Sequence, residues 1–117
     1  MVLQQHSAGC LFSDLPDAPA DESFTELFRG SGYRVERICS RGQASPPGFW
    51  YDQDHTEWVL VLHGAAGLQF EGEAEMKLAA GDYVLIRPHE KHRVNWTQRE
   101  ALTVWLAIHE IPQGGTT

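Results

Sequence analysis

The chain has 117 residues, of which 42% are hydrophobic and 21% are charged, and its net charge is −7. A chain of this length forms one domain and can bury roughly two thirds of its unfolded surface. The negative charge argues against nucleic acid as the main partner, because phosphate binding needs a positive surface.

No apolar run approaches the length of a membrane span, and the chain does not start with a basic region followed by a long apolar stretch. We therefore expect no membrane partner. Cys10 and Cys39 do not form a CxxC pair. Reduced thiols in a cytoplasmic protein are the simplest interpretation of two isolated cysteines, although a single disulfide stays open.

The first 32 residues are predicted to form an arm followed by a short helix. Residues 1 to about 20 are polar and interrupted by prolines, which indicates an arm. The segment ADESFTELFRGSG then has the spacing of a helix. Asp21 or Ser23 would cap it, Phe24, Leu27 and Phe28 would share one face, and Gly30 and Gly32 would end it.

From Tyr33 onward the pattern changes to short strands separated by turns about every ten residues. This rhythm predicts an all-β sandwich or barrel, and the short connections favour antiparallel pairing. We expect residues 33–111 to form the barrel and residues 112–117 a tail. The strands are expected at 33–40, 49–52, 57–63, 68–71, 75–78, 83–87, 92–96 and 102–109.

The stretch WYDQDHTEW places many polar side chains directly before an apolar run. If the chain is extended here, Tyr51, Gln53, His55 and Glu57 lie on one face, and the same parity continues through Val59. A carboxylate in line with valines is costly to bury unless something pairs with it. A second strand that opens with His92 could bring an imidazole to Glu57.

Gln53, His55, Glu57 and His92 together would form a mixed nitrogen and oxygen site for a divalent metal ion. Each residue also has a simpler interpretation. Glu57 could be hydrogen-bonded at a strand end, His92 could be a core histidine, and His55 could lie in a solvated bend. Gln53 is a weak metal ligand and more often orients a substrate.

These residues and their spacing resemble a small cupin, a double-stranded β-helix or jelly-roll barrel. Glu57 to Gly64 matches the E-x6-G part of the first cupin motif, and Gly81 and His92 match positions of the second. The resemblance extends from Tyr33 to His109, and the sequence is also similar to a subgroup of small bacterial cupins.

The sequence also departs from the cupin motifs. Tyr51 and Gln53 stand where the family has its histidine pair, so that only Glu57 and His92 keep the type of a family metal ligand. Other departures are Arg87 for a proline, His89 for a glycine and Trp96 for an asparagine.

The resemblance implies a divalent metal ion (Zn, Mn, Fe or Ni) inside the barrel and a pocket that binds or acts on a small molecule. If the protein is an enzyme, it implies a metal-dependent oxygenase or isomerase. The alternative is a metal-free cupin that binds a small ligand or has a regulatory role without catalysis. Tyr51, His89 and Trp105 are expected to line the pocket, whereas His63 and His109 are weaker candidates. Cupins commonly pair through sheet edges and N-terminal arms, so residues 1–40 are expected to form a homodimer contact.

Overall fold

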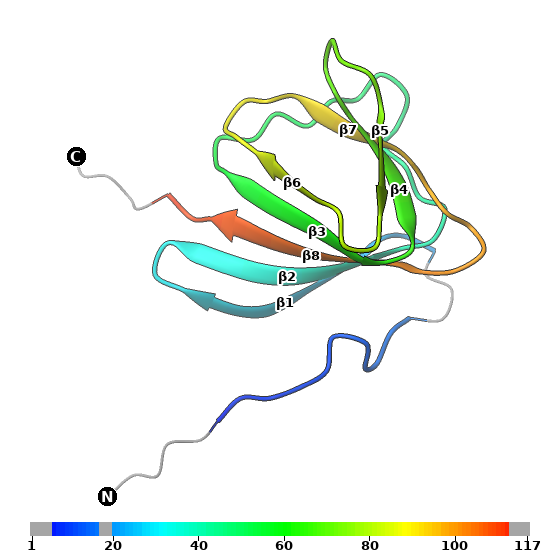
Figure 1. The fold of residues 1–117 in the computed structure, drawn as a ribbon. Helices are drawn as coiled ribbons and strands as arrows, with labels where there is room; N and C mark the ends of the chain where they lie inside the picture. Colours follow the sequence, from blue (N-terminus) through cyan, green and yellow to red (C-terminus); the bar gives the residue numbers. More distant parts are fainter. Residues whose placement is uncertain (1–5, 17–19, 113–117) are drawn as a thin grey trace, which may run out of the picture.

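The computed structural model describes residues 6–16 and 20–112, and in these residues all regular secondary structure is β-strand. No helix in this part of the chain could cross a membrane. Figure 1 shows the strands as two layers. They are β1 (Ser23–Gly30), β2 (Tyr33–Ser40), β3 (Glu57–His63), β4 (Ala65–Phe70), β5 (Met76–Ala79), β6 (Tyr83–Ile86), β7 (His92–Thr97) and β8 (Thr103–Glu110).

The strands form a five-stranded sheet in the order β1-β2-β8-β3-β6 and a three-stranded sheet in the order β5-β4-β7. Every strand pair is antiparallel. The core lies between the two sheets, where Val59 and Val61 of β3 and Trp105 of β8 pack with Leu68 of β4. The predicted alternation therefore holds: apolar side chains of β3 point inward at every second position.

The predicted helix between Asp21 and Gly32 is wrong, because this segment forms β1 and a tight turn into β2. A β-bulge between Glu26 and Phe28 shifts the register by one residue. The bulge interrupts the two-residue period, so the apolar side chains acquire a spacing that imitates a helix. Gly32, which was expected to end a helix, has φ of 89° and supplies the left-handed turn of the hairpin.

Of the eight strands expected from the sequence, the one at 49–52 is reduced to a single bridge. Tyr51 pairs with His92 of β7 by two backbone hydrogen bonds, of 2.7 and 3.1 Å, but the chain around it is irregular. The irregular segment between β2 and β3 runs from the five-stranded sheet to β7. It carries Gln53 and His55 to the interior between the two sheets.

Candidate functional site

A cavity of about 340 Å³ opens between the two sheets. Its size is at the lower end of the range typical of small-molecule sites. The polar lining comes from both sheets and from the irregular segment before β3. The lining residues are Glu22, Phe24, Arg34, Glu36, Ile38, Tyr51, Gln53, His55, Glu57, Val59, Leu68, Ile86, His92, Val94, Trp105 and His109.

Glu57 is the first residue of β3, and its inward position follows from the alternation with Val59 and Val61. It is 9% exposed, yet no residue that the structure describes donates a hydrogen bond to its carboxylate. The Nε2 atom of His109 lies 3.6 Å from Glu57 Oε2, but the same nitrogen is only 2.9 Å from Glu36 Oε1. A buried carboxylate with so little compensation destabilises the empty protein.

His92, the first residue of β7, is 4% exposed and lies in the same cavity wall. Its Nδ1 is 2.8 Å from the backbone oxygen of Glu90, and because a carbonyl only accepts, Nδ1 carries the proton. In the neutral ring, Nε2 is then an acceptor. The ring stacks on Tyr51 with a centroid distance of 5.5 Å and an interplanar angle of 24°, which fixes its orientation.

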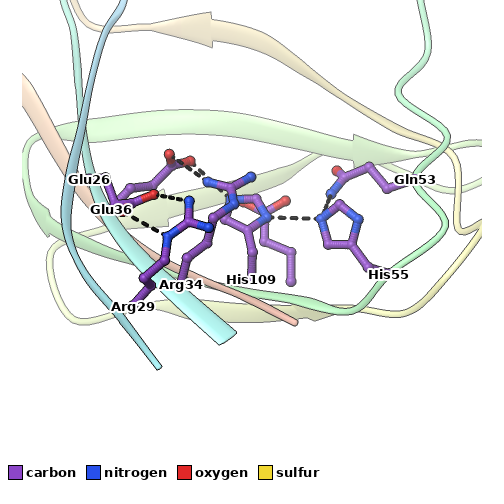
Figure 2. Close-up of polar contacts among 8 residues, drawn as sticks. Glu26, Arg29, Arg34, Glu36, Gln53, His55 and His109 are labelled. Atoms are coloured by element: carbon purple, nitrogen blue, oxygen red, sulfur yellow. Dashed lines mark hydrogen bonds and ion pairs between the residues drawn. The ribbon is translucent and has the colours of Figure 1, made fainter. Parts of the chain in front are cut away.

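A chain of hydrogen bonds crosses another part of the cavity wall (Figure 2). Arg34 Nη1 donates to Glu36 at 2.9 Å, and His109 Nε2 donates to the other oxygen of Glu36. His109 Nδ1 lies 3.0 Å from His55 Nε2, which in turn is 3.1 Å from the side-chain amide nitrogen of Gln53. The chain occupies both oxygens of Glu36 and both nitrogens of His109.

The carboxylates that contact the two rings accept hydrogen bonds. Glu36 accepts from His109 Nε2 at 2.9 Å, and Asp54 accepts from His55 Nδ1 at 3.2 Å. The remaining nitrogens of the two rings, His55 Nε2 and His109 Nδ1, face each other at 3.0 Å. The two imidazoles therefore lie in one chain with the Glu36 carboxylate.

Two pKa values reflect this arrangement. The hydrogen bond from His109 holds the pKa of Glu36 below its usual value, although burial acts in the opposite direction. Burial raises the pKa of Tyr51, and the charges of Glu22 and Glu57 raise it further. Glu36 is therefore an ionised, fully bonded carboxylate, and the Tyr51 hydroxyl keeps its proton at the mouth of the cavity.

The predicted metal ligands Gln53, His55, Glu57 and His92 all line the cavity, but their donor atoms do not form a metal centre. Within residues 6–16 and 20–112, no three His, Cys, Asp or Glu side chains converge in a way that could hold a metal ion. Catalytic zinc sites have three protein ligands, and structural zinc sites have four. His55 uses Nε2 for His109 and the Gln53 amide nitrogen, which leaves Glu57, His92 and the weakly binding amide oxygen of Gln53. This donor set does not fit the metal ion that the cupin resemblance implied.

Of the residues expected to line the pocket, Tyr51 and Trp105 do so, whereas His89 does not. The His89 side chain is 69% exposed, and its Nδ1 bonds to Asp52 Oδ1 at 2.8 Å. His89 has φ of 63°, in the left-handed region that glycine adopts most easily. Its position is the one at which the second cupin motif has glycine, so the backbone keeps the turn of the motif without the glycine.

Sequence reasoning gave little weight to His109 and none to Glu36 and Arg34 as pocket residues. The signal for His109 was present, since Trp105, Ala107 and His109 alternate and all three are buried. Glu36 and Arg34 share the inward parity of Ile38 on β2. Only the pairing of β2 with β8 brings Glu36 to His109.

The fold is a jelly-roll barrel with a cavity between its two sheets, and comparison with known proteins agrees with this fold. The family model for the cupin domain matches residues 40–109, which is more than half of the chain. The protein therefore belongs to the cupin family. No functionally curated protein matches the sequence.

Several solved structures are similar to this chain. A protein of Ralstonia eutropha JMP134, described as a "putative mannose-6-phosphate isomerase", is 45% identical, with a TM-score of 0.88 over 92% of this chain and 100% of its own. An RmlC-like cupin of Desulfovibrio desulfuricans has 12% identity and a TM-score of 0.71, covering 91% of this chain and 97% of its own. A cupin of Desulfitobacterium hafniense has 16% identity and a TM-score of 0.72, covering 94% and 95%. The last two show the likeness of the fold alone.

Proposed function

We propose that this protein binds a small organic molecule in the cavity of its barrel and does not require a metal ion to do so. The observation that carries the proposal is the cavity itself, into which Glu57 and His92 present acceptor atoms that no described residue satisfies. A protein that keeps such groups buried loses stability unless a ligand compensates them. The hydrogen-bond chain from Arg34 to Gln53 holds the adjoining part of the cavity wall in place before a ligand arrives.

The substrate named for the Ralstonia protein suits this cavity poorly. A phosphate group is an anion and needs cationic side chains or a cluster of N–H donors. Among the lining residues Arg34 is the one with a permanent positive charge, and Glu36 already pairs with it at 2.9 Å. Three carboxylates, those of Glu22, Glu36 and Glu57, line the same space and would repel a sugar phosphate.

Thermal unfolding in the presence of a chelator tests the proposal against metal binding. A library of small organic metabolites is expected to contain compounds that raise the melting temperature by several degrees, because a ligand at about 100 times its Kd adds roughly 2.7 kcal/mol. Zn, Mn, Fe or Ni salts without chelator are expected to give no comparable stabilisation. The opposite pattern, with strong stabilisation by one metal and none by organic compounds, would support the metal-dependent alternative and overturn the proposal.

A matched pair of variants shows where the compounds bind. Ile38→Trp adds bulk to the cavity wall, whereas Lys77→Trp adds the same side chain at an exposed position of β5. Active compounds are expected to lose their effect on Ile38→Trp and to keep it on Lys77→Trp. Equal responses of the two variants would place binding outside the barrel.

We also propose a homodimer that forms through β1. This strand is one edge of the five-stranded sheet (Figure 1). Its six central residues are exposed. Phe24 is 59% exposed and Phe28 56%, which is unusual for aromatic side chains on an open sheet edge. Light scattering after size exclusion is expected to give twice the chain mass at micromolar concentration, and Phe28→Lys is expected to give the monomer mass. A wild-type monomer at that concentration contradicts the dimer.

A further inference from the structure

We propose that the ligand of the cavity is a small organic cation, with an ammonium or amidinium group on an apolar body, and that Glu57 and His92 bind the cationic group. The inference rests on the proposed function and names the class of ligand that the same cavity takes. It follows from three properties of the cavity wall. These are the hydrogen-bonding atoms without a partner, the charges of the lining side chains, and the apolar character of the remaining surface.

Two buried residues of the cavity wall, Glu57 and His92, present acceptor atoms without a hydrogen-bond partner among the described residues. The Glu57 carboxylate receives no hydrogen bond from any residue that the structure describes, and Nε2 of neutral His92 has a lone pair because Nδ1 donates to Glu90. Among the described residues, the side-chain polar atoms that are both inaccessible to solvent and without a hydrogen-bond partner are Arg37 Nε and Trp105 Nε1. The oxygens of Glu57 and Nε2 of His92 are not in this group, so they remain accessible from the cavity. These two buried acceptors select a ligand that donates.

The charges of the wall favour a positive ligand. Glu22, Glu36 and Glu57 contribute three negative charges. Arg34 is the lining residue with a permanent positive charge, and it pairs with Glu36 at 2.9 Å. His109 Nε2 lies 2.9 Å from Glu36 and 3.6 Å from Glu57. Glu22 and Glu57 therefore have no arginine or lysine partner in the wall, and Glu57 is the more buried of the two, at 9% exposed. In so enclosed a place a charge-assisted hydrogen bond from a cation is stronger than one from a neutral donor.

The rest of the wall is apolar and aromatic. Val59, Leu68, Ile86 and Val94 form the sides, so the ligand needs an apolar part that fills this space. Phe24 and Tyr51 line the cavity while being 59% and 39% exposed, which places aromatic faces at its mouth. An aromatic face attracts a cation within about 6 Å of its centroid. A flat or branched hydrocarbon that bears an N–H cation matches both parts of the surface.

Isothermal titration with three ligands of one shape and different charge tests the inference. Benzylamine, benzyl alcohol and benzoate share an apolar body and are cationic, neutral and anionic at about pH 8, where an imidazole with the ordinary pKa is neutral. In the presence of a chelator, benzylamine is expected to bind at least about tenfold more tightly than benzyl alcohol, with benzoate weakest. Glu57→Gln is expected to reduce the affinity for benzylamine about tenfold, to that of the alcohol. Glu73→Gln, which removes the same charge from an exposed turn, is expected to leave it unchanged.

Each other outcome overturns the inference in a recognisable way. Equal affinity for the three ligands, or a preference for benzoate, refutes the cation class while the binding function stands. Glu57→Gln and Glu73→Gln having equal effects refutes the role of Glu57. A titration of Mn or Zn alone that gives tight, Glu57-dependent binding shows that the cation is a metal ion, which refutes both this inference and the proposed function. If neither the three ligands nor the compound library binds, the proposed function fails and the inference fails with it.

Discussion

Replacing Arg93 by methionine is expected to lower the free energy of unfolding by about 2–4 kcal/mol, the sum of several hydrogen bonds from one charged, half-buried side chain. The Arg93 guanidinium donates to the backbone oxygens of Ser45, Pro46 and Phe49 at 2.9–3.1 Å. Its Nε donates to Asn95 Oδ1 at 2.7 Å, and its Cζ lies 5.7 Å from the centroid of the Trp50 ring. No other side chain of the described residues holds this loop by as many hydrogen bonds.

The loop held by Arg93 leads directly into Tyr51, so its loosening should also affect the cavity. Chemical denaturation measures the stability, and binding of any compound found in the thermal screen measures the cavity. Arg93→Lys keeps the charge but cannot form the planar set of hydrogen bonds, so we expect most of the loss to persist. Arg87→Met, at an exposed position just after β6, is the control and is expected to change stability by less than about 0.5 kcal/mol. Equal effects of Arg93→Met and Arg87→Met would show that the loop does not depend on this side chain.

The barrel could be predicted from the sequence because its strands alternate. In β3 the even spacing of Val59 and Val61 placed Glu57 inside, and the structure agrees. The first hairpin could not be predicted in this way. The bulge in β1 removes the period, most side chains of β1 are exposed, and the strand depends on pairing with β2. Tertiary pairing overrides local propensity in such a segment.

The site could be predicted only in part, for a related reason. Residues on β3 and β7 were found because both begin with a polar residue at a motif position, Glu57 and His92. The contact of Glu36 with His109 joins β2 to β8, and these two residues lie 73 positions apart along the chain. Its geometry depends on the register between strands, which one sequence does not reveal. The expected metal centre also depended on directions of side chains, and His55 turns toward His109.

Glu57→Gln and Glu36→Gln are expected to change the stability of the ligand-free protein in opposite directions. The Glu57 carboxylate is buried with no hydrogen bond from a described residue, so the neutral isostere is expected to stabilise the protein by about 1–2 kcal/mol. The Glu36 carboxylate accepts from both Arg34 and His109, so the same replacement there is expected to cost about 2–4 kcal/mol. The two residues are similarly buried, at 9% and 8% exposed, so the contrast isolates the effect of the hydrogen bonds that each carboxylate accepts.

The most direct test is urea denaturation of the wild-type protein and Glu57→Gln, side by side, in chelator and without ligand. The account predicts a higher midpoint for Glu57→Gln with an unchanged dependence on urea, because a buried charge that awaits its ligand has been removed. A lower midpoint for Glu57→Gln would show that the carboxylate already has a stabilising partner in the empty protein, and it would contradict the account.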